Sequence, residues 1–487
     1  MTRTFFVASA VFVLTASIVG LGYLVGRNDT ANLLLLYSLA FAAYLLCYRL
    51  AQTPQRVKQL LVVAVVVRAV LIPAMPNLSD DIYRFVWDGR LLAQGYDPFA
   101  YLPSEIIAGE GNVTALGINQ ALYDRLNSPD YYTIYPLVNQ AVFALAAWAS
   151  PTSVRGSAII IRLIIFAAEL LTLWLLMRLL NTEPYLRRHP TRNNEYGPSH
   201  GRSEIARISS FSIHHSLFNI PFLQTIQGKK KPPYQPPPRT ILLYALNPLV
   251  IIELTGNLHF EALMITFVLG SVYLLRQQKL ILSGVALALA VCTKLVPLIF
   301  LPLYLRRLGW QRAALFYAVV GITTVTLFLP LVTPELLVGM RDSVGLYFQK
   351  FEFNASVYYL VREVGFYRKG YNIIQSAGPW LAAFTFLGIV LYTLRERERH
   401  LLAAFGGVWL IYLLLSTTVH PWYVTPLLAF SVFTPYRYAL LWSGLIFFSY
   451  VGYTANGFSE NLWVTTLEYT AVGGLLVWEV HRRVVNS

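Results

Sequence analysis

Apolar segments of about 20 residues recur from one end of this chain to the other, and they constrain its fold more than any other feature. As a helix, a segment of that length spans the roughly 30 Å hydrocarbon core of a bilayer. Hydrophobic residues make up 56% of the 487 residues and charged residues only 13%, which is far from a soluble globular composition. The sequence therefore predicts an all-α polytopic membrane protein.

The basic residues predict how the spans are oriented. Most of the net charge of +14 lies in loops that the positive-inside rule assigns to the cytoplasm, so it reflects topology rather than nucleic-acid binding. We expect about 12 transmembrane helices, among them Ile241–Leu254 and Tyr423–Phe433, with both termini cytoplasmic and a second outer loop at Pro334–Gly378. The first apolar run, Phe5–Val25, lacks a small-residue cleavage site and is expected to stay as a span. Gln59–Met75 is expected to run outward, which places a long first loop on the non-cytoplasmic side.

Three regions follow from this topology. Residues 1–180 form an N-terminal transmembrane module whose outer loop covers about residues 76–156. Within that loop, Leu137–Trp148 is too short to span and is expected to lie in the interface. Residues 181–239 read as a basic, flexible cytoplasmic insert, and residues 240–487 form a C-terminal transmembrane module.

One apolar run, Leu280–Leu305, breaks the simple alternation of spans. Both of its flanks are basic, and Lys294 and Pro297 interrupt its middle. A re-entrant pair of half-helices satisfies the charge rule, whereas one straight span violates it. We therefore expect Lys294 at the outer tip of a hairpin, at a depth where an ionisable residue usually faces a cavity or a partner.

An acidic pair, Asp80-Asp81, follows the third apolar run and opens the stretch Asp80–Arg90. Helix capping explains one of these carboxylates but not the continuation through Arg84, Asp88 and Arg90 at helical spacing. Other ionisable and aromatic residues also fall near the predicted outer face: Glu253, His259, Glu261, Lys294, His420, Trp422 and Tyr423.

Several chemistries find no support in the sequence. Cys47 and Cys292 both fall inside predicted spans, so neither a disulfide framework nor a thiolate metal site is indicated. No motif of nucleotide hydrolysis or of the common hydrolases is present. A divalent metal on the Asp80–Asp81 pair would need a ligand set that the sequence does not complete, so no cofactor is assigned.

The stretch from Ser79 to Arg90 resembles the first-loop signature of bacterial polyprenyl-phosphate-mannose-dependent mannosyltransferases of the GT-C glycosyltransferase superfamily. Asn247-Pro248-Leu249, Gly256-Asn257-Leu258-His259 and Thr293–Pro297 resemble further elements of that group, in the expected order. Two features depart from the resemblance. The 181–239 insert is longer than expected, and Phe260-Glu261 stands where Asn-Asp is expected, which leaves the role of Glu261 open.

The resemblance implies a GT-C-type bundle in the bacterial inner membrane, with the acidic first loop at its active site. It also implies an inverting transfer of a hexose, mannose by analogy. The donor would be a polyprenyl-phosphate sugar and the acceptor a glycan or glycolipid, and the protein would also contact membrane lipids.

The residues themselves fit such a reaction. An acceptor hydroxyl needs one carboxylate as base, and a departing phosphate needs cations. Sequence alone does not choose between Asp80 and Asp81 as the base. The candidates for donor-phosphate binding are Lys294, Arg84, Arg90 and His420. The candidates for acceptor or sugar binding are Asp88, Tyr83, His259, Glu261, Trp422 and Tyr423.

Two other function classes stay open. A lipid-linked polysaccharide ligase or polymerase would share the outer-loop logic, with Arg362, Arg368 and Lys369 as its candidate residues. A polytopic transporter should show paired broken segments in two related halves, whereas this sequence shows one.

Overall fold

A computed structural model describes residues 2–109, 113–181, 234–329, 351–396, 400–454 and 457–485. The insert predicted at 181–239 falls mostly on residues 182–233, which lie outside the described residues, as does the part of the second outer loop from 330 to 350. The described chain is mostly helical, which confirms that part of the predicted fold class. Its one small sheet is a hairpin of β1 (Tyr453–Thr454) and β2 (Gly457–Phe458).

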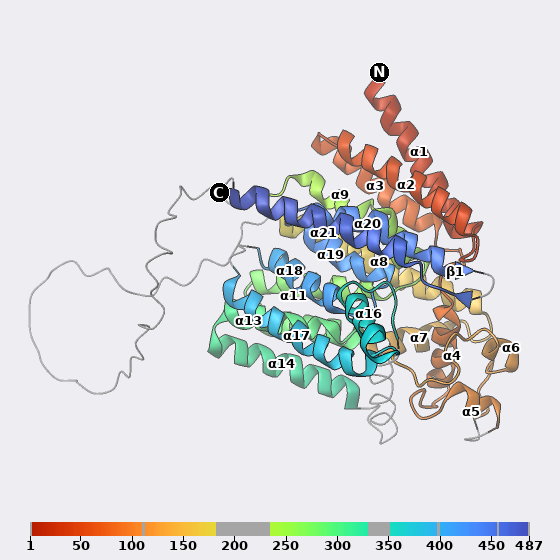
Figure 1. Cartoon of the computed structure of the whole chain (residues 1–487). Helices are drawn as coiled ribbons and strands as arrows, with labels where there is room; N and C mark the ends of the chain where they lie inside the picture. Colours follow the sequence, from red (N-terminus) through yellow and green to blue (C-terminus); the bar gives the residue numbers. More distant parts are fainter. Residues whose placement is uncertain are drawn as a thin grey trace, which may run out of the picture.

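The chain begins with three helices that lie together at one edge of the molecule (Figure 1): α1 (Thr2–Tyr23), α2 (Thr30–Leu50) and α3 (Pro54–Val70). Asp29 and Thr53 cap α2 and α3 through their side chains, and Pro54 occupies the first turn of α3, where its missing N–H costs nothing. The short α1–α2 connection lies beside Asp80, because its Arg27 forms an ion pair with the Asp80 carboxylate.

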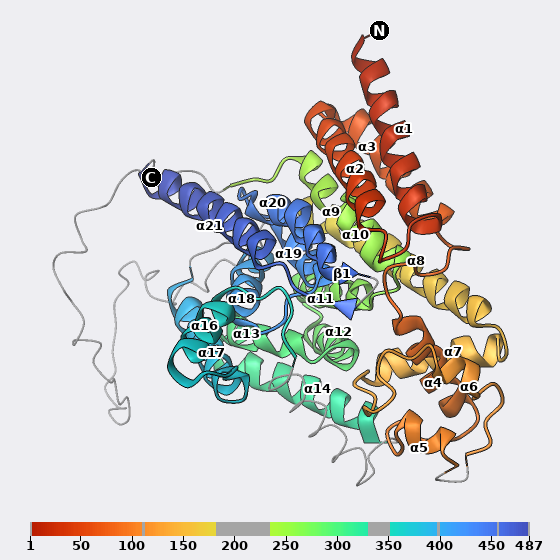
Figure 2. The ribbon, with the colours of Figure 1, turned by 45° about the vertical axis from the view of Figure 1, so that its right-hand side comes forward.

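The predicted first outer loop folds into a helical lobe (Figures 1 and 2). Its helices are α4 (Asp81–Ala93), α5 (Pro103–Ile107), α6 (Gln120–Tyr123) and α7 (Leu137–Ala149). The α4 and α7 backbones touch at Gly89, where an added Cβ would lie 2.3 Å from the carbonyl oxygen of Phe143. The rings of Phe85 and Phe143 stack beside this contact. One face of α7, the helix expected in the interface, is therefore buried in the lobe, while Trp148 on another face is exposed.

A long helix, α8 (Val154–Asn181), and a broken helix form the centre of the molecule. The first half of the broken helix is η3 (Pro238–Ile241) with α9 (Leu242–Ala245), and the second half is α10 (Pro248–Val250) with the π-helix η4 (Ile251–Gly256). The two halves meet at a 44° bend. Pro248 lacks the N–H that would continue the helix, and Asn247 caps the second half. Ile241–Leu254, expected as one span, is therefore broken.

The return predicted within Leu280–Leu305 is present. Helix α11 (Glu261–Arg276) leads into α12 (Leu280–Thr293), Lys294 is extended, and η5 (Val296–Phe300) continues as α13 (Leu301–Leu308). Tyr304 on the returning arm contacts Ser271 of α11 at 2.7 Å. Arg312, at the start of α14 (Trp310–Phe328), reaches Gln278 in the turn before α12. Lys294 meets Glu261 at the other end of α11, so it lies at the tip of the hairpin.

The C-terminal part adds further helices, several of them short: α16 (Val357–Lys369), α17 (Ile374–Arg395), α18 (Leu401–Leu415), η7 (Pro421–Val424), α19 (Thr425–Ser431), α20 (Tyr438–Leu445), η8 (Ile446–Gly452) and α21 (Leu462–Val485). The end of α21 lies far from the lobe of α4–α7 in both views (Figures 1 and 2).

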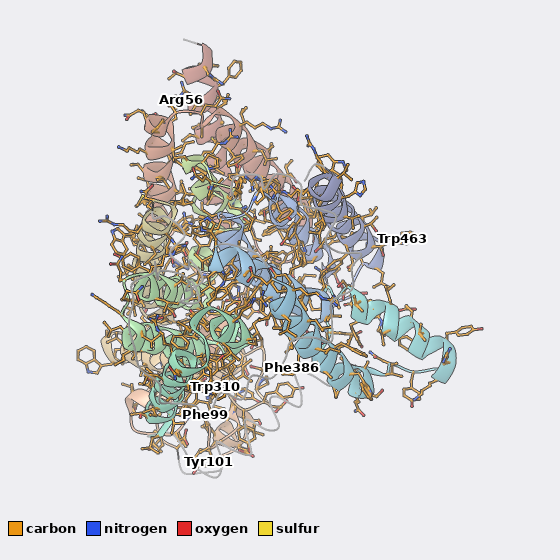
Figure 3. The ribbon with its side chains drawn as sticks, turned by 90° about the vertical axis from the view of Figure 1, so that its left-hand side faces the viewer. Arg56, Phe99, Tyr101, Trp310, Phe386 and Trp463 are labelled. Carbon is orange, nitrogen blue, oxygen red and sulfur yellow. The ribbon has the colours of Figure 1, made fainter. Side chains whose placement is uncertain are left out.

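The expected count of about 12 spans is not confirmed. Among the described residues, five helices are long and apolar enough to cross a membrane, or six if the bent pair counts as one span. These five are α1, α2, α8, α14 and α17. The surfaces of α1, α8, α14, α17 and α21 carry exposed aromatic side chains, of which Figure 3 labels Trp310, Phe386 and Trp463. Such helices support a membrane protein; the number of crossings and the orientation of the termini stay predictions.

Candidate functional site

The two carboxylates of the first loop stand at the beginning of α4 and have different partners. Arg27 donates to Oδ2 of Asp80 at 2.6 Å, and its guanidinium also lies over the ring of Tyr453. Asp81 accepts from the side-chain amide of Asn127 at 2.7 Å through Oδ1. Both carboxylates are partly exposed, and the helix N-terminus favours negative charge here. Asp80 is thus ion-paired, whereas Asp81 has a neutral partner.

Arg84 and Asp88, one and two turns further along α4, form a buried ion pair at 2.8 Å. Arg84 also donates to the carbonyl oxygens of Ser128 and Tyr131, while Asp88 accepts from Thr133 and Gln140. These bonds tie the returning part of the loop to α4. The structure therefore places both residues in the support of the lobe, and a direct contact of either with donor or acceptor stays a prediction.

Arg90 and Tyr83 also contact the lobe itself. Arg90 donates to the carbonyl oxygen of Gly117 at 2.6 Å, and burial lowers the pKa of its guanidinium. Arg125 donates to the hydroxyl of Tyr83 and lies over its ring. Arg90 lies nine positions after Asp81 on α4, a rise of about 14 Å along the helix. Arg90 is thus not brought together with the carboxylate pair.

A tight turn joins the broken helix to α11 and carries His259. Arg162 of α8, fully buried, donates to the carbonyl oxygens of Thr255 and Gly256 and, on the other side, to those of Ile72 and Ala74. Leu258 has a φ of 65°, a left-handed conformation that is costly for a branched residue. The turn is therefore held against the segment that leads into Asp80.

Glu253 lies in the π-helix before this turn and is fully buried. It accepts hydrogen bonds from the Tyr450 hydroxyl at 2.9 Å and the Asn257 amide at 3.2 Å. Nε2 of His259 lies 3.3 Å from its carboxylate, an ion-pair distance, but off the direction of a hydrogen bond. π-Helical turns occur frequently at functional sites.

His259, Trp422 and His420 form a stack of three rings. The centroid of Trp422 lies 3.7 Å from that of His259 and 4.4 Å from that of His420, with nearly parallel planes in both contacts. The indole faces are thus engaged by imidazoles, so Trp422 can contact a sugar through its edge but not as a stacking platform. Burial, together with His259 and Lys294, lowers the pKa of His420 to about 3. His420 is therefore neutral at physiological pH, so as a donor-phosphate ligand it would offer a hydrogen bond rather than a positive charge.

Lys294 completes the cluster at the hairpin tip. Its ammonium contacts Oε1 of Glu261 and lies 4.7 Å from the ring centroid of Tyr423, while about a quarter of its side chain stays exposed. Glu261 is almost fully buried, and its Oε2 has no hydrogen-bond partner among the described residues. Glu261 is thus the counterion of Lys294, an arrangement in which a ligand anion could share the ammonium.

Direct contacts join this cluster to the first loop. The ring of Phe260 packs on those of Phe85 and Phe143, so the start of α11 rests on the lobe. Asp81 lies one turn before Phe85 on α4. Burial raises the pKa of Tyr135, and both Asp81 and Glu261 add to the rise, which places this phenol near both carboxylates. The structure therefore brings Asp80, Asp81, His259, Glu261, Lys294, His420, Trp422 and Tyr423 to one end of the molecule.

Some buried polar atoms of this cluster have no hydrogen bond. In the described part of the chain these include Nε2 of His259, Nδ1 of His420 and Oε2 of Glu261, and atoms in the same state occur elsewhere, as at Arg90 and Asn139. Each such atom costs about 1–3 kcal/mol unless water or a ligand satisfies it. No group of three or more His, Cys, Asp and Glu side chains that could hold a metal occurs among the described residues.

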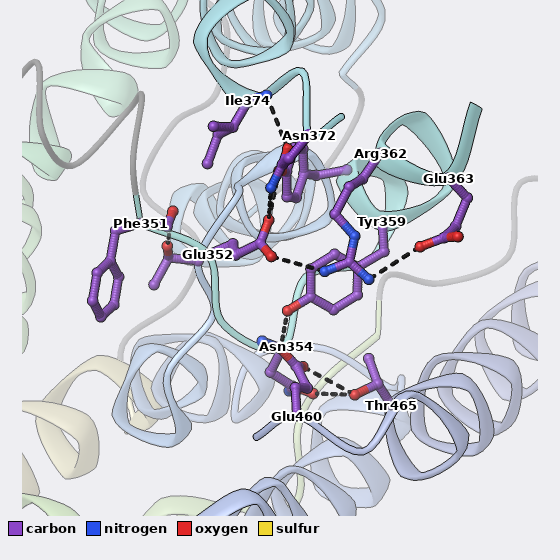
Figure 4. Close-up of polar contacts among 12 residues, drawn as sticks. Phe351, Glu352, Asn354, Tyr359, Arg362, Glu363, Asn372, Ile374, Glu460 and Thr465 are labelled. Carbon is purple, nitrogen blue, oxygen red and sulfur yellow. Dashed lines mark hydrogen bonds and ion pairs between the residues drawn. The ribbon is translucent and has the colours of Figure 1, made fainter. Parts of the chain in front are cut away.

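Sequence reasoning missed Arg27 and Tyr450, which hold Asp80 and Glu253. Arg27 sits in an ordinary polar turn, and Tyr450 in an apolar run, so neither carries a signal of its own. Arg362 of α16, which favoured the ligase alternative, is paired with Glu352 in the segment before that helix and with Glu363 (Figure 4).

Comparison with known families adds one finding. Residues 234–308 match the MptA_B family, described as alpha-(1->6)-mannopyranosyltransferase, N-terminal domain. The matched stretch runs from the broken helix to the end of the hairpin, so it contains Glu253, His259, Glu261 and Lys294. This similarity supports mannosyl transfer as the activity and a glycosyltransferase as the class of enzyme. No curated protein matches the chain.

Proposed function

We propose that this protein is an integral-membrane glycosyltransferase that moves mannose from a polyprenyl-phosphate donor to an acceptor hydroxyl at the outer face of the membrane. The observation that carries the proposal is that helix α4, which begins at Asp81, packs through Phe85 on Phe260, the neighbour of the Lys294 counterion Glu261. The mannosyltransferase match covers the Lys294 side of this cluster. A lipid-linked donor fits a site outside the cytoplasm, because nucleotide sugars are cytoplasmic.

The proposed reaction is a single displacement with inversion. The acceptor oxygen forms a bond to the anomeric carbon as the bond from that carbon to the phosphate oxygen breaks. The acceptor proton passes to a carboxylate, and the lipid phosphate leaves with the bonding electrons. A base near the acceptor and a cation near the departing oxygen are the two groups that the protein must supply.

Asp81 is the better candidate for the base. Arg27 occupies Oδ2 of Asp80 and balances its charge, so Asp80 is suited to orient the acceptor or to keep the helix end in place. Asp81 accepts one hydrogen bond from a neutral amide through Oδ1, and its Oδ2 has no protein partner among the described residues. An oxygen in that state can take a proton from an acceptor hydroxyl.

Lys294 is the candidate for the cation at the donor phosphate. Its ammonium already lies beside a buried carboxylate and an aromatic ring, and the exposed part of its side chain leaves room for an anion. As negative charge develops on the departing oxygen, the ammonium would stabilise the transition state more than the bound donor. Neutral His420 would add a hydrogen bond rather than charge.

The test uses the purified protein in lipid nanodiscs with radiolabelled polyprenyl-phosphate mannose as donor. An alkyl mannoside and an extract of membrane glycolipids serve as probe acceptors, and nucleotide-linked mannose serves as the competing donor. We expect label to move from the lipid phosphate to an acceptor with the unaltered protein. We expect no transfer by the Asp80→Asn/Asp81→Asn double variant. Transfer from the nucleotide sugar but not from the lipid donor would refute the proposal.

A further inference from the structure

Asn354, in the segment that leads into α16, has an unusual conformation and a complete set of partners. Its φ is 44°, in the left-handed region, and the residue is fully buried. Its backbone N–H donates to Glu460 at 2.8 Å, and its carbonyl oxygen accepts from the Tyr469 hydroxyl at 2.7 Å. The side chain is also bonded at both ends, to Thr465 and Glu468. Figure 4 shows Asn354 beside Glu460 and Thr465.

Glu468 is the least expected of these partners, because it is a buried carboxylate in the apolar helix α21. It accepts from the Asn354 amide at 3.1 and 3.2 Å and from the indole N–H of Trp442 at 2.7 Å. All these donors are neutral. Ionisable residues at such positions are costly and usually serve a function. Here the hydrogen bonds to Glu468 offset that cost, and they hold the Asn354 amide in a fixed orientation.

The residue before Asn354 connects this network to the candidate site. Phe353 donates its backbone N–H to the carbonyl oxygen of Thr417 and accepts from the N–H of Val419, in a parallel bridge to Thr418. Its ring lies 4.5 Å from that of His420. The segment that carries His420 is therefore paired to the backbone that Asn354 orients.

We propose that Asn354, fixed by Glu468, is a positioning residue for the transfer reaction and acts through Phe353 to hold His420 in its stack with Trp422. This positioning role requires no contact between Asn354 and substrate. Asn354 fixes the backbone conformation at a left-handed position. The parallel bridge made by Phe353 couples this conformation to residues 417–419, and thereby sets the position of His420. The inference rests on the proposed function, since its effect on rate requires His420 to contact the donor.

The main variant is Asn354→Gly, which tolerates the positive φ but removes both side-chain bonds. Gln278→Gly is the matched control, because Gln278 also has a positive φ, of 61°, but lies in the turn between α11 and α12, at the other end of the hairpin. We expect Asn354→Gly to lower kcat by about tenfold with a smaller change in donor KM, and the control to leave both unchanged.

A double-variant cycle separates positioning from general stability. If Asn354 acts through His420, Asn354→Gly should have little further effect in a His420→Ala background. Additive losses would overturn the proposal. Normal transfer by His420→Ala alone would overturn it too, but would leave the roles of Asp81 and Lys294 intact, so the two failures can be told apart.

An exchange of partners gives a second check that does not depend on Asn354→Gly folding well. Asn354→Asp alone removes the amide that donates to Glu468 and places a second carboxyl group beside it, so it should lose more activity than Asn354→Gly. Combining it with Glu468→Gln exchanges amide and carboxylate, with Thr465 and Trp442 still able to donate. We expect this combination to recover kcat. If both variants fold, as judged by thermal melting, and the exchange recovers no activity, the proposal is wrong.

Discussion

The charged and polar side chains of this site differ in the groups that lie beside them. Lys294 has a buried carboxylate beside it, Asp80 has a guanidinium, and His420 is stacked among aromatic rings. We propose Lys294, whose side chain is about a quarter exposed, as the charge that meets a ligand, and Asp81, which has a neutral partner, as the proton acceptor. These differences were not readable from the sequence, which predicted the same role in donor-phosphate binding for Lys294 and His420.

Lys294→Met should lower kcat severely, with a smaller effect on donor KM, because a transition-state contact to the departing phosphate is lost. The substitution also leaves Glu261 buried and unpaired, so the control is Lys294→Met/Glu261→Gln, which removes that destabilising charge. Steady-state transfer assays on both variants check the prediction. If the double variant transfers mannose at the normal rate, the phosphate is held elsewhere.

The stability of the protein should fall as the pH falls below about 6.5, in part because of His420. Its pKa is lowered to about 3 in the folded protein, against about 6.5 in an unfolded chain. Between these values the unfolded state binds the extra proton, so folding loses stability on acidification. His420→Gln should reduce the slope of melting temperature against pH between 6.5 and 4.5. An unchanged slope would show that His420 does not contribute.

At the scale of elements, the site is made where helices end or break. A proline lies at each break, Pro248 at the bend and Pro297 after the extended Lys294. The sequence predicted only the return at Leu280–Leu305, because basic residues flank that run on both sides. It did not predict the break in Ile241–Leu254, where a proline after asparagine was read as part of a span. The left-handed residues Leu258 and Asn354 carry no sequence signal, because their conformation is imposed by tertiary contacts.

Arg162 should be the most sensitive tie between these elements. Arg162→Met removes one buried cation that satisfies four carbonyl oxygens from two separate segments. The unpaired carbonyls should destabilise the fold by several kcal/mol. Arg155→Met is the matched control, because Arg155 reaches one carbonyl, that of Pro73, from an exposed position on the same helix. Thermal melting in detergent should show a large shift for the first variant and a small one for the second.

At the scale of the whole molecule, the lobe of α4–α7 and the cluster around Lys294 lie at one end, and the basic connection between α11 and α12 lies at the other end of the hairpin. Composition predicted a helical membrane protein because apolar runs dominate it. The number of spans stays a prediction, because runs such as Tyr423–Phe433 fold as short helices, here η7 and α19. Hydropathy counts apolar residues but does not register the prolines that break them.

The predicted topology can be checked with cysteines at exposed positions. Leu116→Cys, in the lobe, should react with a membrane-impermeant maleimide in intact cells, whereas Gln277→Cys, in the α11–α12 turn, should react only after permeabilisation. The two native cysteines, Cys47 and Cys292, are buried and should give little background. Labelling of both positions from outside would contradict the orientation.

The most direct test of the central claim is the single-turnover rate of mannosyl transfer by Asp81→Asn and by Asp80→Asn, each loaded with the lipid-phosphate donor. Loss of a general base typically lowers the rate by about 10²–10⁴-fold. We predict a loss of that size for Asp81→Asn with donor binding retained, and for Asp80→Asn chiefly a weaker affinity for the acceptor. Near-normal transfer by both variants would contradict the account.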